Sequence, residues 1–160
     1  MKKQILLLLF CAMGFMLLLV IALLERSVSP LLWNAAAIIP EEDIRLTFSA
    51  LQRVVGVLPY TLGVIILGTF SCSIWQCIYS KWSKFSLAVL IALLIPMIYN
   101  IFLADTAAVV ENLTNTQASD ALPQVQLSLM AAVQQHHIGL LGFTLSFLFQ
   151  AYIVFTNPNT

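Results

Sequence analysis

A chain of 160 residues, of which 61% are hydrophobic and only 9% are charged, differs from a soluble domain, where about a quarter of the residues carry charge. So few charged side chains cannot cover a globule in water, and the chain is therefore expected in a lipid bilayer. Its seven basic and seven acidic residues give a net charge of zero, and we predict no nucleic-acid partner.

Four stretches of the chain lack Asp, Glu, Lys and Arg, and each is long enough for a helix to cross a bilayer. Such a helix needs roughly 20 apolar residues, and lipid offers backbone amides no other partners. We predict a single all-α domain of residues 1–160, an integral membrane four-helix bundle. The predicted spans cover about residues 5–24, 54–78, 85–104 and 136–155.

The first span begins like a secretory signal, with the basic start "MKKQILLLLF". Its apolar part is longer than that of such signals, and the following "ALLERSVS" contains no cleavage site of small residues. We therefore expect the first span to be retained as a helix.

The stretch "IIPEEDIRL" predicts where the second helix begins. Pro40 suits a first turn, and the three acidic residues after it lie near the positive end of the helix dipole. No helix breaker follows until Pro59. This helix is expected to begin outside the membrane and to run to about Ile78, with a kink near Pro59.

The polar segment "VVENLTNTQASD", residues 109–120, predicts a loop between the third and fourth helices. Pro123 then fits an early helical turn, and the pattern is helical as far as Phe155. The residues from Gln124 to Phe155 would extend about 48 Å as a helix, which exceeds the thickness of the hydrocarbon core. The first turns of the fourth helix are therefore expected outside the membrane.

Lysine and acidic residues occupy different loops. The acidic residues all fall in the loops after the first and third spans, whereas the lysines lie at the N-terminus and in the turn between the second and third spans. Because cytoplasmic loops carry an excess of basic residues, both termini are predicted to be cytoplasmic. We expect a multi-pass membrane protein, located in the inner membrane of a bacterium. The lysines are Lys2, Lys3, Lys81 and Lys84.

Small residues align along single helix faces, where they allow membrane helices to pack closely. On the first helix, Cys11, Gly14 and Leu18 share a face that leads to Glu25. The corresponding face of the fourth helix consists of Gln135, Gly139, Gly142, Ser146 and Gln150.

Most polar side chains of the spans fall at one depth, near the outer membrane boundary. Polar groups in a membrane are unfavourable unless they have partners, so we predict a pocket at the outer end of the bundle. No metal site and no cofactor are predicted. The predicted binding residues are Arg53, Tyr60, Gln135 and His136, and the catalytic candidates are His136, His137 and Asn100.

These residues also have purely structural explanations. Histidines at a membrane surface bind water or headgroups, Arg53 can reach lipid phosphates, and Asn100 can join helices. Because consecutive helical residues point about 100° apart, His136 and His137 are not expected to serve one buried point. At most one is predicted to be a site residue, and His136 is favoured.

Several features in order along the chain carry a resemblance to a known family. They are Pro30-Leu31 after the first span, "IPEEDIRLTFSALQRVVGVLPY" before the second, Asn100 closing the third, and a histidine at the start of the fourth. This layout resembles that of small four-helix membrane proteins related to anthrone oxygenases. The resemblance implies oxidation of polycyclic aromatics without metal or flavin, with His136 or His137 as base and Asn100 nearby.

Two classes of function follow from the sequence. The sequence contains no nucleophile–base pair, metal cluster or phosphate loop, and it has faces of small residues on several helices. These features favour a non-catalytic accessory or structural subunit, or a scaffold that binds an apolar ligand. The alternative is a small cofactor-independent, oxygenase-like membrane enzyme that acts on an apolar aromatic substrate with a histidine general base. Besides lipid, the expected partners are other membrane subunits or further copies of the chain.

Overall fold

The structure, a computed structural model, describes residues 2–34, 37–81 and 83–156, and every regular element in these ranges is helical. The all-α class is therefore confirmed. In chain order the elements are α1 (Lys2–Leu24), the 3₁₀ helix η1 (Ser29–Leu32), α2 (Glu41–Val55), α3 (Leu58–Tyr79), α4 (Lys84–Ile98), the π-helix η2 (Tyr99–Leu103), α5 (Thr106–Asn115) and α6 (Leu122–Thr156).

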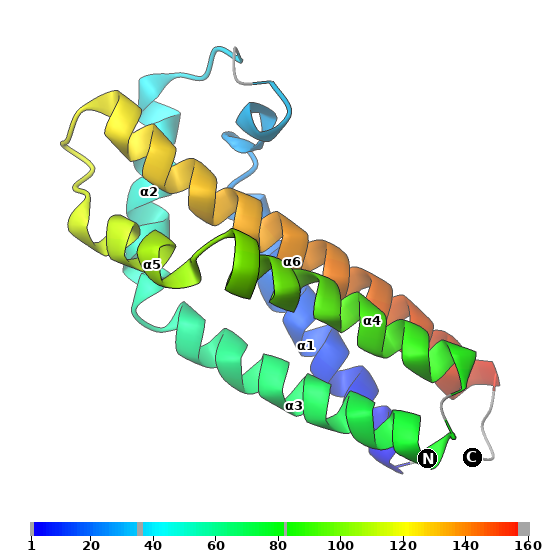
Figure 1. The fold of residues 1–160 in the computed structure, drawn as a ribbon. Helices are drawn as coiled ribbons and strands as arrows, with labels where there is room; N and C mark the ends of the chain where they lie inside the picture. Colours follow the sequence, from blue (N-terminus) through cyan, green and yellow to red (C-terminus); the bar gives the residue numbers. More distant parts are fainter. Residues whose placement is uncertain (1, 35–36, 82, 157–160) are drawn as a thin grey trace.

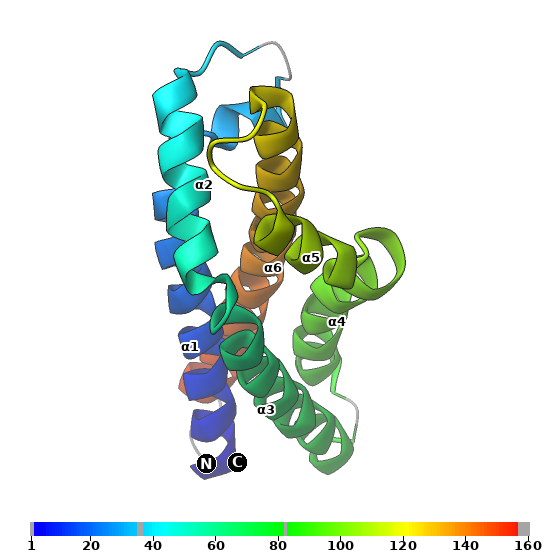
Figure 2. The same ribbon diagram turned by 90° about the vertical axis from the view of Figure 1, so that its left-hand side faces the viewer.

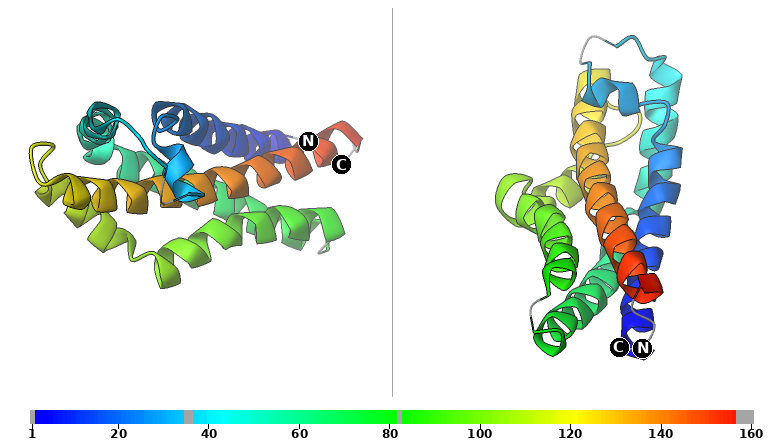
Figure 3. Two further views of the ribbon diagram at one scale, coloured as in Figure 1. Left: turned by 90° about the horizontal axis from the view of Figure 1, so that it is seen from above. Right: turned by 90° about the vertical axis from the view of Figure 1, so that its right-hand side faces the viewer.

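Helix α6 is the longest element, and the other long helices are arranged around it. Both α1 and α4 pack along α6, while α3 packs against α1 and α4 (Figures 1 and 3). The start of α1, the end of α6 and the turn between α3 and α4 lie together at one end of the molecule, called the terminal end below (Figure 1). Helices α2 and α5 and the first turns of α6 form the opposite end, called the α2/α5 end.

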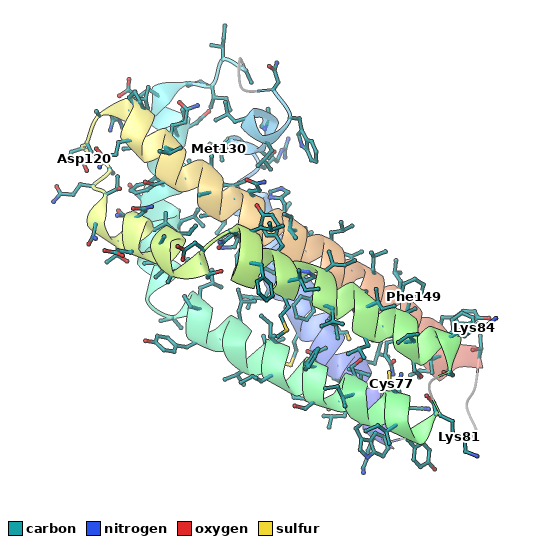
Figure 4. All side chains as sticks on the ribbon, in the orientation of Figure 1. Cys77, Lys81, Lys84, Asp120, Met130 and Phe149 are labelled. Atoms are coloured by element: carbon teal, nitrogen blue, oxygen red, sulfur yellow. The ribbon has the colours of Figure 1, made fainter. Side chains whose placement is uncertain are left out.

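The charge separation expected from the sequence is visible along the long axis. Lys81 and Lys84 lie at the terminal end, and Asp120 lies at the α2/α5 end (Figure 4). Three helices, α1, α3 and α6, are long and apolar enough to cross a membrane. The structure is therefore compatible with a multi-pass membrane protein.

The third predicted span corresponds to two consecutive elements. Helix α4 contains only 15 residues, but the π-helix η2 continues it to Leu103. In η2 the amide of Ala104 donates to the carbonyl oxygen of Tyr99 at 3.0 Å, which is the i to i+5 pattern of a π-turn. Together α4 and η2 cover nearly the same residues as the predicted span 85–104.

Glycines on α6 and α1 allow the helices to approach closely. A Cβ atom at Gly142 would lie 2.6 Å from Pro96 Cγ and 2.9 Å from the carbonyl oxygen of Ala92, both on α4. A Cβ atom at Gly14 of α1 would overlap the ring of Phe143 on α6. The small face predicted for the fourth helix is therefore an interface with both neighbours, and its buried members are Gly139, Gly142, Ser146 and Gln150.

The second predicted helix is divided into two. A continuous helix from Pro40 to Ile78 is wrong at Gly56 and Val57, where α2 ends and α3 begins. Pro59 occupies one of the first two positions of α3. The amides of the first helical turn have no partner within the helix, so proline, which lacks an amide hydrogen, costs no hydrogen bond there. Helix α3 consequently runs in a different direction from α2 (Figure 2).

The predicted loop at residues 109–120 is wrong in its first half, because α5 extends through it to Asn115. Asp105 begins this helix. Its backbone is left-handed, with φ of 41°, and its side chain accepts a hydrogen bond from the amide of Ala108 at 3.3 Å. A capping aspartate satisfies an amide that the first turn of the helix would otherwise leave without a partner.

Two polar side chains of α2 hold the α2/α5 end together. Gln52 donates to the carbonyl oxygens of Leu113 and Thr116 at 2.9 and 2.6 Å, which ties α2 to the end of α5. Arg45 donates to the carbonyl oxygen of Asp120 at 2.9 Å, just before α6 begins. These bonds join three elements that also share buried apolar side chains, among them Phe48, Leu113 and Leu129.

A buried amide pair joins α3 and α6 at the terminal end. Gln76 Nε2 donates to Gln150 Oε1 at 2.8 Å, and Gln150 Nε2 donates to Gln76 Oε1 at 3.0 Å. Gln150 also donates to the carbonyl oxygen of Gln4 on α1 at 3.0 Å. Because buried amides are unfavourable without partners, this reciprocal pair fixes the relative positions of three helices.

Candidate functional site

A cavity of about 290 Å³ lies toward the α2/α5 end, between α3, α4, η2, α5 and α6. Helices α3 and α4 meet near the turn that joins them and diverge toward this end (Figure 2). The polar residues that line the cavity are Asn100, Thr106, Gln135 and His136, and the others are Leu18, Leu58, Pro59, Leu62, Gly63, Ile66, Phe70, Leu93, Pro96, Met97, Val110, Gly139 and Phe143.

Asn100 of the π-helix lines the cavity and carries a side-chain acceptor without a hydrogen-bond partner. Asn100 Oδ1 is buried and has no hydrogen-bond partner. The backbone around it is held in place, because the carbonyl oxygen of Asn100 accepts a hydrogen bond from the Thr106 hydroxyl at 2.9 Å. A buried acceptor without a partner is unfavourable by about 1–3 kcal/mol, so a ligand that donates a hydrogen bond here would remove this penalty.

A carboxylate from α1 holds the histidine that lines the cavity. Glu25 directly follows α1 and is fully buried, with 0% of its surface exposed. Its Oε1 atom lies 2.6 Å from Nδ1 of His136 on α6. Because Nδ1 is occupied by the carboxylate, Nε2 is the ring nitrogen of His136 that remains for a ligand. Helix α1 thus orients a side chain that belongs to the cavity.

The neighbouring histidine contacts the same carboxylate. Nδ1 of His137 lies 3.6 Å from Glu25 Oε2 and 2.9 Å from the carbonyl oxygen of Val133. The two histidines therefore flank one buried carboxylate, but only His136 lies within hydrogen-bond distance of it and lines the cavity, so the expectation that at most one of them is a site residue stays a prediction. Glu25 has two oxygen atoms, and each ring lies near a different one.

The predicted site residues divide into two groups. Asn100, Gln135 and His136 line the cavity together. Arg53 is exposed in the last turn of α2, and Tyr60 is 79% exposed on α3; neither of them lines the cavity. Whether any of these residues acts in binding or catalysis stays a prediction.

Sequence reasoning did not include Glu25 among the site residues. The small face of α1 was seen to lead to it, and Cys11, Gly14 and Leu18 are indeed buried on that face. An acidic residue that continues a buried helix face is the signal that could have identified it. In the described ranges, no group of three or more His, Cys, Asp or Glu residues could hold a metal ion.

Comparison of the chain with models of protein families, with curated proteins and with solved structures found no match.

Proposed function

We propose that this protein is an integral membrane protein in which α1, α3, α4 with η2, and α6 all cross the bilayer. Large apolar side chains are exposed along each of these helices, and lipid would cover them. The pair α4 and η2 is long enough to join the three longer spans. Exposed examples are Met13, Val20, Leu67, Ile91 and Leu148.

The proposed orientation places the terminal end in the cytoplasm. Lys3, Lys81 and Lys84 are exposed at or near that end, and acidic residues such as Glu41 and Glu111 are exposed on α2 and α5 at the other. The excess of basic residues on cytoplasmic loops supports this assignment. In this orientation the cavity lies in the outer half of the membrane, beneath α5.

The cavity is proposed to bind a small apolar molecule that carries one hydroxyl group. A mostly apolar wall with a few converging polar groups is typical of a small-molecule site. The observation that carries this proposal is that two polar residues line the cavity together: Asn100, whose buried Oδ1 has no partner, and His136, whose ring is held by Glu25. Both can accept a hydrogen bond from a hydroxyl group.

The test is the binding of 2-naphthol to the purified protein in detergent micelles, followed by ligand fluorescence. Naphthalene is the matched ligand without the hydroxyl. After correction for partition into empty micelles, 2-naphthol is expected to bind about tenfold more tightly, because about 1.4 kcal/mol is within reach of one well-placed hydrogen bond.

A filled cavity should abolish the binding of both ligands. Gly63 lines the cavity, and a Cβ atom there would meet no other atom within 4 Å, so Gly63→Leu has room to place its side chain. Val64→Leu is the matched control, because Val64 is 68% exposed next to Gly63 and does not line the cavity. Equal binding by wild type and Gly63→Leu would contradict the proposal.

The contact between Glu25 and His136 supports a second candidate function, that of an enzyme. His136 would act as the general base for a hydroxylated apolar substrate, and Glu25 would stabilise the imidazolium that forms. The resemblance to anthrone oxygenases would make dioxygen the oxidant. Consumption of dioxygen with 2-naphthol by wild type but not by His136→Gln would favour this function over binding alone.

An accessory role in a larger assembly agrees with ligand binding and stays a prediction. The exposed apolar helix faces could contact other membrane subunits or a second copy of the chain as well as lipid. Copurification of the protein in mild detergent would show which of these partners remains bound.

A further inference from the structure

Polar and apolar residues are separated along the length of the cavity. The polar lining residues all lie toward the α2/α5 end, and they are Asn100, Thr106, Gln135 and His136. Gln135 donates to the carbonyl oxygen of Ala104 at 3.3 Å, just before α5 begins. Phe143 also lines the cavity and lies about two turns beyond His136 on α6, which is about 10 Å toward the terminal end.

The inner part of the cavity has an apolar lining. Phe70 of α3 and Leu93 of α4 line it together with Phe143 of α6. Among the lining residues that the structure describes, polar side chains are therefore confined to one end. A ligand with one polar end would match this lining in only one direction.

The cavity is elongated in the same direction. Leu58 and Phe70 both line it, and a helical segment between two such positions extends about 18 Å. A volume of about 290 Å³ spread over such a length describes a narrow space. Its shape suits a linear apolar chain better than a broad molecule.

The cavity opens along α3, on the surface that lipid is proposed to cover. Ile66 lines the cavity and is 37% exposed, and its neighbours Val64 and Leu67 are exposed as well. In Figure 1, α1 is visible behind the space between α3 and α4, and Leu18 of α1 is part of the lining. At the α2/α5 end the lining residue Thr106 is exposed. The apolar part of the cavity is thus open toward hydrocarbon, and its polar end lies near the membrane surface.

This arrangement parallels that of a molecule in the outer leaflet of the proposed membrane. An amphiphile in that leaflet holds its polar end at the surface and its chain toward the midplane, because hydrocarbon does not solvate polar groups. The polar residues of the cavity lie on the outer side and the apolar residues toward the midplane. A leaflet molecule would therefore match the cavity without turning over.

We infer that the cavity takes an amphiphile of the outer leaflet that has one terminal hydroxyl group and a linear apolar chain, as in a long-chain alcohol. The hydroxyl group lies beside Asn100 and His136, and the chain extends along α3 toward Phe70. The ligand enters from the bilayer past Ile66. The inference rests on the proposed function, because it names the class of ligand for that same cavity and the direction in which the ligand lies.

Octanol and the octanediol that has a hydroxyl group at each end test this direction, because they differ only at the inner end of the chain. Each is measured as a competitor of 2-naphthol on the purified protein in micelles, with concentrations expressed as mole fractions in the micelle. Octanediol is expected to compete about tenfold more weakly than octanol, because its second hydroxyl group would be buried without a partner.

Phe70→Tyr adds a hydroxyl group to the inner lining and keeps the aromatic ring. It is expected to bring the affinity of octanediol closer to that of octanol, because the added phenol can bond the second hydroxyl group. Phe149→Tyr is the matched control, since Phe149 is also half-buried but does not line the cavity. In this control the preference for octanol should equal that of wild type.

Equal competition by octanol and octanediol in wild type would overturn the inference, because the cavity would then have no preferred direction. An undiminished preference for octanol in Phe70→Tyr would also overturn it, since the chain would not extend to residue 70. In both cases 2-naphthol would still bind, so the proposed function would stand. Absence of binding by both 2-naphthol and naphthalene is a different result, which would overturn the proposed function and the inference with it.

Discussion

Glu25→Gln is expected to raise the dissociation constant of 2-naphthol about tenfold and to leave that of naphthalene unchanged. In wild type, Nδ1 of His136 lies 2.6 Å from a carboxylate oxygen, which favours a proton on Nδ1 and an acceptor at Nε2. A glutamine amide can donate to Nδ1 instead, and the ring proton then resides on Nε2. The nitrogen that should accept the ligand hydroxyl thereby becomes a donor.

The readout for this substitution is the pair of binding curves, together with the ¹⁵N shifts of His136, which report which ring nitrogen carries the proton. Glu111→Gln is the control for the loss of one negative charge, because Glu111 is exposed on α5 and does not line the cavity. Equal weakening of both ligands in Glu25→Gln would indicate a collapsed cavity. Unchanged preference for 2-naphthol would show that His136 does not recognise the hydroxyl.

The long helices were predictable because composition alone determines them. A charge-free apolar run of membrane-spanning length has few stable arrangements other than a helix, and α1, α3 and α6 follow those runs closely. The break at Gly56 and Val57 was harder to predict from the sequence, because Pro59 is compatible both with a kink and with the first turn of a new helix. The same applies to α5, whose polar composition also suits a loop and whose contacts with α2 come from a distant part of the chain.

The candidate site was predictable only in part, for a physical reason. The depth of Asn100, Gln135 and His136 follows from their place in each apolar run, and these three residues do line one cavity. Arg53 shares that depth, but it lies on the exposed side of α2. Depth is a one-dimensional quantity, whereas the contact of Glu25 with His136 depends on how α1 and α6 are rotated against each other. That rotation is set by side-chain packing across 111 residues of sequence separation.

Gly142→Val is expected to destabilise the fold strongly, because α4 and α6 are in contact at this glycine. A Cβ atom at Gly142 would lie 2.6 Å from Pro96 Cγ, 2.7 Å from Pro96 Cδ and 2.9 Å from the carbonyl oxygen of Ala92. A proline ring and a backbone oxygen cannot turn aside as a flexible side chain can. Overpacking of this kind lowers the free energy of unfolding by roughly 1–3 kcal/mol, and by more where the backbone must move. The melting temperature of the protein in micelles should fall by several degrees.

Two further variants separate the packing contact from the loss of a glycine. Gly63→Ala introduces the same methyl group as Gly142→Ala, but within α3, where no other atom lies within 4 Å of it, and it is expected to be neutral or slightly stabilising because alanine favours a helix. Pro96→Ala removes the two ring atoms nearest to Gly142, so Gly142→Ala should destabilise Pro96→Ala protein less than it destabilises wild type. This difference is the coupling energy of the contact. Equal destabilisation in the two backgrounds would mean that the Pro96 ring does not contact Gly142. The packing of α4 against α6 also positions Pro96 and Asn100 at the cavity, so the stability measurement tests the geometry on which the proposed site depends.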